Sequence, residues 1–231
     1  MKTMTNPTNT TSNPTNTDWV PTKGRRRSRS LWLAPLIMLI VLFAVIAGVA
    51  AGESSAKADL ETQLLGMVAP IVPERLVDHT DVRGQPYLWS RHNEMISTAY
   101  LYLDGGTDRT EQFLLVQNLD LKTGVAERFR TFVRVPYPDG TPTPQLDRTP
   151  NRSQAIIDGQ VVTYGAELVG DQVVISADGG TAPQPVTIAA LTNGSNELTG
   201  DKRPEVTGVV PIDDFIVVEL TSNNVQLGSG R

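Results

Sequence analysis

The most prominent feature of the hydropathy pattern is one uninterrupted apolar run near the N-terminus. Residues 31–51 contain no charged side chain and are mainly aliphatic. A helix of this length rises about 30 Å, at roughly 1.5 Å per residue, which is the apolar thickness of a bilayer. Pro35 falls in its first turn, where a missing N–H costs little, and Trp32 falls at the expected headgroup level. The pattern predicts a transmembrane helix over residues 31–51.

After a short predicted stalk over residues 52–58, the pattern becomes that of a one-sided helix. Its apolar stripe consists of Leu60, Leu64, Val68 and Ile71. This spacing of three or four places the side chains on one helix face, which needs a covering layer. Ser54 and Ser55 are candidate N-caps, and Pro70 and Pro73 are expected to end the helix.

The remaining chain alternates apolar and polar positions with a period of two, which is typical of strands. The predicted strands cover residues 96–103, 111–121, 125–135, 160–164, 173–177, 186–191, 215–221 and 225–227. Residues 136–150 contain five prolines, so they are expected to form an extended loop. The expected fold class is therefore α+β: a single N-terminal transmembrane helix, then a mostly antiparallel curved sheet packed on one amphipathic helix. Residues 59–231 are expected to form one β-rich domain.

Two of the predicted strands each have one apolar face. Period two places Phe113, Leu115, Leu119 and Leu121 together on residues 111–121, and Phe129 and Val133 together on residues 125–135. If these strand faces lie opposite the apolar stripe of the helix, the two surfaces could line a lipid groove. The candidate lining residues are Leu60, Leu64, Val68, Phe113, Leu115, Phe129 and Val133. The same residues would equally form an ordinary filled core.

The opposite face of residues 125–135 carries Arg128, Arg130 and Arg134. Three guanidinium groups on one strand face are candidates for contact with phosphate headgroups. The alternative is the hydrated face of an amphipathic strand, which this pattern favours.

Charge is divided unevenly along the chain, whose formal net charge is −5. Residues 1–30 carry six cations and one anion, whereas residues 53–231 carry 14 cations and 24 anions. The positive-inside rule predicts that residues 1–30 form a cytoplasmic tail, disordered because it is rich in Asn, Thr and Pro. It also predicts that the acidic domain lies outside the plasma membrane, on the periplasmic or cell-wall side. An acidic domain does not suit nucleic acid as a partner.

A cleaved signal peptide is the alternative to a permanent anchor. Ala56-Lys57-Ala58 matches the A-x-A cleavage pattern, and Val49-Ala50-Ala51 is another acceptable cleavage site. The 30-residue leader and the length of the apolar run favour an uncleaved anchor.

Residues for catalysis or metal binding are few. The chain has no cysteine and two histidines, His79 and His92, which are too isolated to predict a metal site. No nucleophile elbow, phosphate-binding glycine loop or zinc-protease motif is present. Asp213 and Asp214 are adjacent, so we interpret them as a solvated loop rather than an acid pair. We expect no enzyme activity, no cofactor and no metal.

Three short segments resemble a known family. Val82–Leu88 (VRGQPYL) matches the pattern V-x-G-x-P-[FY]-L found near the start of LmeA-like phospholipid-binding proteins of actinobacterial cell envelopes. Residues 159–168, and Val210-Pro211 followed by residues 215–227, are similar to the middle and end of that family. The resemblance implies half of a tubular lipid-binding fold, phospholipid as the ligand and a role in envelope glycolipid assembly. The stretch from Pro211 to Phe215 is shorter than the family pattern, as if one strand were missing.

Three functional hypotheses follow from the sequence. The favoured one is a membrane-anchored extracytoplasmic phospholipid-binding protein. The alternative is a non-catalytic envelope scaffold that binds a protein partner. The third, a hydrolase with an unrecognised site, has no motif to support it.

Overall fold

The computed structural model describes residues 33–228 except 73, 85, 105–109, 147–150, 189–190 and 192–202. The chain divides into two compact units, residues 1–45 and residues 46–231. The predicted cytoplasmic tail lies outside the described residues. Two helices and a 3-10 turn are present in the described part: α1 (Leu33–Val68), η2 (Glu74–Leu76) and α2 (Tyr87–His92). The strands are β1 (Val77–Arg83), β2 (Met95–Leu103), β3 (Glu111–Asp120), β4 (Val125–Pro136), β5 (Gln154–Ile157), β6 (Gln160–Val169), β7 (Gln172–Asp178), β8 (Val186–Thr187), β9 (Glu205–Pro211) and β10 (Phe215–Gln226).

Helix α1 is a single helix of 36 residues and joins the two helices that the sequence predicts separately. No helix begins at Ser54 or Ser55, because both lie inside α1. Ser54 Oγ donates a hydrogen bond to the Ala50 carbonyl one turn earlier, a common contact of serine within a helix. The expected stalk over residues 52–58 is therefore helical, and Ala56 within it is fully buried.

The two parts of α1 differ in burial. Every side chain from residue 35 to residue 51 is exposed, although nearly all are apolar. From Ala56 onward one stripe is buried, at Leu60, Leu64, Met67 and Val68. The helix ends at Val68, two residues before Pro70, as the sequence predicts. Within the described residues, α1 is the one helix long and apolar enough to span a membrane.

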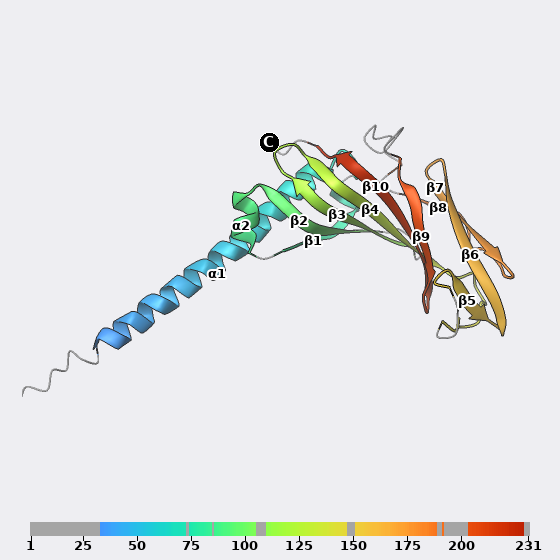
Figure 1. The fold of residues 1–231 in the computed structure, drawn as a ribbon, viewed down its shortest axis with the longest axis horizontal. Coiled ribbons are helices and arrows are strands. Elements are labelled where there is room, and N and C mark those ends of the chain that lie inside the picture. The colour runs from blue at the N-terminus through green and yellow to red at the C-terminus, as the bar shows by residue number, and fades with distance from the viewer. Residues whose placement is uncertain are drawn as a thin grey trace, which may run out of the picture. The chain divides into compact units, whose positions relative to one another are not determined.

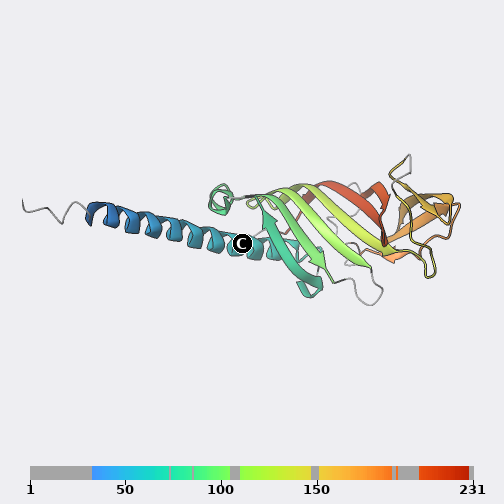
Figure 2. The ribbon, with the colours of Figure 1, turned by 90° about the horizontal axis from the view of Figure 1, so that it is seen from below.

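The strands form two antiparallel sheets (Figure 1). The larger sheet has six strands in the order β1-β2-β3-β4-β10-β9, and the smaller has four in the order β5-β6-β7-β8. Figure 2 shows the larger sheet as a curved layer over the end of α1 that lies in the second unit. The expected α+β class with a mostly antiparallel curved sheet is confirmed.

The hydrophobic core lies between the buried stripe of α1 and the concave face of the larger sheet. One connected cluster contains helix residues such as Leu64 and Met67, together with Leu101, Leu114 and Phe129 from β2, β3 and β4. The cluster continues into the smaller sheet through Val162, Val173 and other residues.

Along β3 and β10 the buried side chains change parity, that is, they switch from even-numbered to odd-numbered positions. The switch occurs at a row of the sheet that contains one asparagine on each strand. On β3 the core positions are Leu114 and Val116 before Asn118, but Leu119 after it. Asn118 has a φ of 50° and Asn224 on β10 has a φ of 52°, the left-handed conformation that asparagine tolerates better than most residues. A left-handed residue rotates the following side chain to the other face. The assignment of Phe113 and Leu119 to one face is therefore wrong.

Four strands or helices were not predicted. Strand β1 is mostly polar, α2 has only six residues, β5 has four and β9 has seven. Residues 215–221 and 225–227, predicted as two strands, largely form the single strand β10. Within the predicted strand over 186–191, Val186 and Thr187 form β8, and residues 189–190 lie outside the described residues.

Candidate functional site

The concave face of the larger sheet brings together five of the seven groove candidates. Leu60, Leu64 and Val68 of α1 contact the same buried cluster as Phe129 and Val133 of β4. Each of the five is at most 1% exposed. In this conformation the helix side chains occupy the space in front of the strands, and the face is a packed core.

The other two groove candidates do not belong to that cluster. Phe113 lies on the convex face, where its ring stacks on Phe132 with a centroid distance of 4.6 Å and on Tyr102 at 6.1 Å. Tyr102 in turn stacks on His79 at 4.1 Å. Leu115 is 7% exposed and pairs in register with Tyr100 and Arg130. The structure thus replaces part of the predicted groove with a row of aromatic rings across β1 to β4.

The three arginines of β4 do not form a free cationic surface. Arg130 lies 3.3 Å from the Glu219 carboxylate, and Arg134 donates a hydrogen bond of 2.6 Å to Glu111. Arg134 also lies over the Phe113 ring, 5.5 Å from its centroid. Arg128 is exposed at the row where the buried face changes parity. Carboxylates therefore balance two of the three candidate headgroup ligands.

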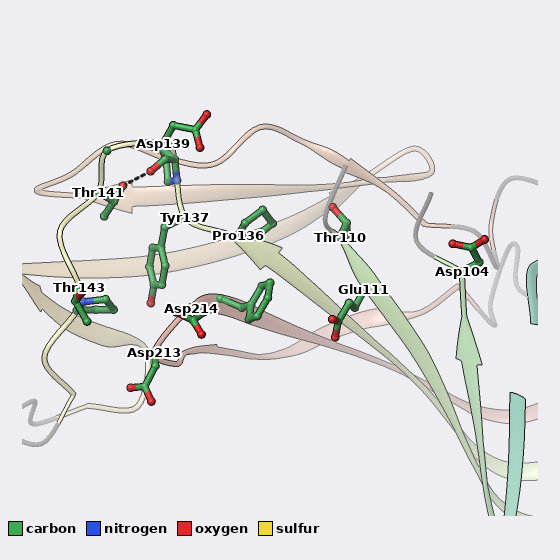
Figure 3. A pocket seen from close by; sticks show the side chains of 14 residues that line it. Asp104, Thr110, Glu111, Pro136, Tyr137, Asp139, Thr141, Thr143, Asp213 and Asp214 are labelled. Atoms are coloured by element: carbon green, nitrogen blue, oxygen red, sulfur yellow. Dashed lines mark hydrogen bonds between the residues drawn. The ribbon is translucent and has the colours of Figure 1, made fainter. Parts of the chain in front are cut away.

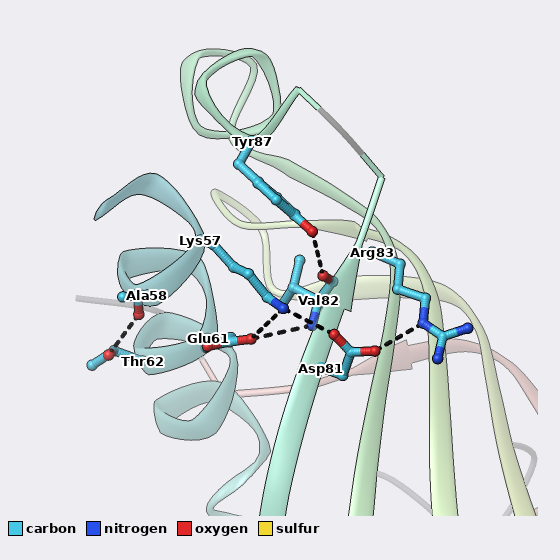
Figure 4. Close-up of polar contacts among 8 residues, drawn as sticks. All are labelled: Lys57, Ala58, Glu61, Thr62, Asp81, Val82, Arg83 and Tyr87. Carbon is cyan, nitrogen blue, oxygen red and sulfur yellow. Dashed lines mark hydrogen bonds and ion pairs between the residues drawn. The ribbon is translucent and has the colours of Figure 1, made fainter. Parts of the chain in front are cut away.

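The edge strand β1 is covered by α1, as Figure 4 shows. Glu61 accepts a hydrogen bond of 3.5 Å from the Val82 backbone N–H, and Lys57 donates one of 3.0 Å to Asp81. An uncovered edge would expose backbone donors to pairing with other chains, so these contacts protect it. The helix therefore fixes the position of the first strand as well as filling the concave face.

Charge complementarity at this edge shifts two pKa values. The pKa of Asp81 is lowered, first by the hydrogen bond from Arg83 Nε at 2.8 Å and then by the bond from Lys57. The pKa of Lys57 is raised, mainly by its hydrogen bond to Asp81. Both shifts favour the charged pair, so these residues have a structural role.

A cleft of about 690 Å³ opens where β3, β4 and the turn between β9 and β10 meet (Figure 3). Its walls carry five carboxylates, from Asp104, Glu111, Asp139, Asp213 and Asp214. Tyr137 lies between them and donates a hydrogen bond of 2.9 Å to the Ile212 carbonyl, and burial raises the pKa of its hydroxyl. Sequence analysis missed this cleft because its residues come from distant segments.

The carboxylates among the described residues of the acidic cleft are not grouped as metal ligands. Asp213 and Asp214 are both exposed in the β9–β10 turn, which confirms their interpretation as a solvated loop. Across the described part of the chain, no three acidic, histidine or cysteine side chains are grouped so that they could hold a metal ion.

Comparisons with family models, with curated proteins and with solved structures give no match. The family resemblance therefore rests on its three short segments. One of them, Val82–Leu88, spans the end of β1 and the start of α2, beside residues 52–61 of α1.

Proposed function

We propose that this chain is a single-pass membrane protein whose β domain binds phospholipid outside the cytoplasm and supports the assembly of envelope glycolipids. One observation carries the proposal: a single helix contains residues 33–51 of the apolar segment and also covers the apolar concave face of the curved sheet. The family resemblance implies half of a tubular lipid-binding fold, and in such a fold this helix would close the curved sheet and acyl chains would lie between the two layers.

The distribution of charge supports the orientation. Six cations precede the apolar segment and none lies within it. Such an excess of cations favours retention of the N-terminus in the cytoplasm. The β domain would then follow on the outside, and its anchor would hold it against the membrane surface.

The chemistry of the domain favours recognition of lipid tails over headgroups. Residues 53–231 carry ten more anions than cations, and Arg130 and Arg134 are paired with carboxylates. Broad attraction to anionic headgroups is therefore weak. Binding would depend on apolar contact with the concave face, where burial of each methylene contributes about 0.8 kcal/mol.

A second candidate is a non-catalytic envelope scaffold, and one observation favours it. The concave face is filled by the chain's own side chains, with Leu64 and Val133 completely buried. A lipid would have to displace part of α1, whereas a scaffold would keep this core intact.

A photoreactive lipid separates the two candidates. The full chain is placed in nanodiscs containing phosphatidylcholine with a diazirine in its acyl chain, and adducts are mapped by peptide mass spectrometry. Lipid binding predicts adducts around Leu64 and Phe129 in addition to those in the apolar segment. Adducts confined to the apolar segment would contradict lipid binding and favour the scaffold.

Two substitutions on α1 provide the matched control. Leu64→Trp adds volume at a fully buried position, whereas Thr62→Trp adds it at an exposed position two residues away. We expect Leu64→Trp to reduce adducts at Phe129 several-fold and Thr62→Trp to leave them unchanged. Circular dichroism of both variants checks that the sheet is retained.

A further inference from the structure

The short helix α2 carries the most exposed large apolar side chain among the described residues of the β domain. Trp89 is 64% exposed, and Leu88 beside it is 42% exposed. Met95, 47% exposed at the start of β2, borders the same shallow cleft as Trp89. Exposure of much of an indole ring to water is unfavourable, so a patch of this kind indicates a contact surface.

The position of α2 is fixed by contacts with α1 at the end of the apolar segment. The Glu53 carboxylate accepts hydrogen bonds from the backbone N–H groups of Tyr87, at 2.5 Å, and Leu88, at 3.3 Å. A Cβ atom added to Gly52 would lie 3.4 Å from Leu88 Cδ1. Arg91, in the last turn of α2, pairs with Asp59 at 2.8 Å. All of these residues belong to the unit 46–231, and their contacts place α2 against residues 52–59 of α1.

These contacts determine the depth of α2 relative to a membrane. The apolar segment ends at Ala51, and Glu53 is the first charged residue after it. At about 1.5 Å per residue, Glu53 lies only about 3 Å beyond the last apolar residue. The headgroup layer on each side of the apolar core is about 5–7 Å thick. The start of α2 therefore falls within the headgroup layer if residues 31–51 span the bilayer.

We infer that α2 is an interfacial element that places Trp89 and Leu88 in the headgroup layer of the outer leaflet. An amphipathic indole suits this layer, because tryptophan is enriched at the interface between membrane and water. The contact gives the β domain a second attachment to the bilayer and restricts its tilt about α1. The inference rests on the proposed membrane anchor.

Single-tryptophan variants of the full chain test the inference, because the chain has three tryptophans. Trp19→Phe/Trp32→Phe leaves Trp89 as the reporter, and Trp19→Phe/Trp89→Phe leaves Trp32, which lies in the predicted span. Each variant is reconstituted in phosphatidylcholine vesicles containing a lipid with a headgroup nitroxide. We expect this lipid to quench at least half of the Trp89 emission, and acrylamide in the water to quench Trp89 several-fold less than free indole.

The outcomes distinguish the inference from the anchor. If the nitroxide lipid quenches Trp32 but acrylamide alone quenches Trp89, the anchor holds and the interfacial role of α2 is wrong. If neither tryptophan responds to the nitroxide lipid, the anchor itself fails and the inference fails with it. As a control, Val169→Trp in a background without other tryptophans tests an exposed apolar position of β6. It should respond to acrylamide only, and quenching of this control by the nitroxide lipid would show that the signal is not specific to α2.

Discussion

Leu64 offers the most direct test of the packing between α1 and the sheet. Its side chain is completely buried in the cluster that includes Phe129 and Val133. Leu64→Ala removes three carbon atoms, whose transfer from water contributes about 2.4 kcal/mol at roughly 0.8 kcal/mol each. The cavity left in a rigid core adds to this loss, so we expect a total of about 3–5 kcal/mol.

Equilibrium unfolding of the full chain in detergent micelles measures this loss. Urea unfolds the β domain, and far-ultraviolet circular dichroism at the β-sheet minimum follows the transition. Thr62→Ala is the matched control, because Thr62 is exposed on the same helix and its hydroxyl bonds only to the Ala58 carbonyl. We expect the control to change the free energy of unfolding by less than about 0.5 kcal/mol. A decrease in the free energy of unfolding of less than about 1 kcal/mol for Leu64→Ala would refute the packing of α1 against the sheet.

Two further predictions concern β1 and the glycine that follows it. Gly84→Ala should destabilise the domain by more than about 1 kcal/mol, because Gly84 has a φ of 114° and its new Cβ would lie 2.2 Å from Ser97 Oγ. Chemical denaturation should show a smaller loss for Gly140→Ala, where φ is 81° but the space is open. Asp81→Asn should cost about 0.2–1 kcal/mol at pH 7, since the pair is partly exposed. Arg83 lowers the pKa of Asp81, so the stability difference between Asp81→Asn and the native chain is fully present above the unfolded pKa of about 3.9. It disappears as pH falls through the lower folded pKa. A stability difference that does not change with pH would contradict this role.

The sequence predicts those parts of the fold in which a local pattern alone determines the structure. The apolar segment and the stripe Leu60, Leu64 and Val68 depend on composition and helical spacing, and α1 contains this stripe and residues 33–51 of the segment. Ile71, predicted in the same stripe, is buried but follows the end of α1. The inward placement of Phe129 and Val133 is correct for the same reason, because no left-handed residue interrupts the alternation between them.

The errors arise where distant parts of the chain determine the structure. The change of parity at Asn118 moves Phe113 to the convex face, and asparagine within a strand is the one sequence signal that indicates it. Strand β1 has no apolar alternation because the α1 residues Lys57 and Glu61 cover its edge with polar contacts. Helix α2 is too short for a periodic pattern, and Glu53, 34 residues before Tyr87, caps it. None of these tertiary contacts is visible in a local window of sequence.

The packed concave face does not by itself oppose lipid binding, because the exchange of side chains for an acyl chain is nearly balanced. Displacing Leu60, Leu64, Met67 and Val68 would lose about 6–12 kcal/mol, at roughly 1.5–3 kcal/mol for each buried side chain. An acyl chain of about 14 methylenes would regain about 11 kcal/mol at the same rate. Stability and lipid affinity should therefore oppose each other at these positions. If the domain binds lipid, Leu64→Ala should fold less stably but bind lipid more tightly, because the acyl chain displaces less apolar surface. For a scaffold with a permanent core, Leu64→Ala would lose stability without any gain in lipid binding.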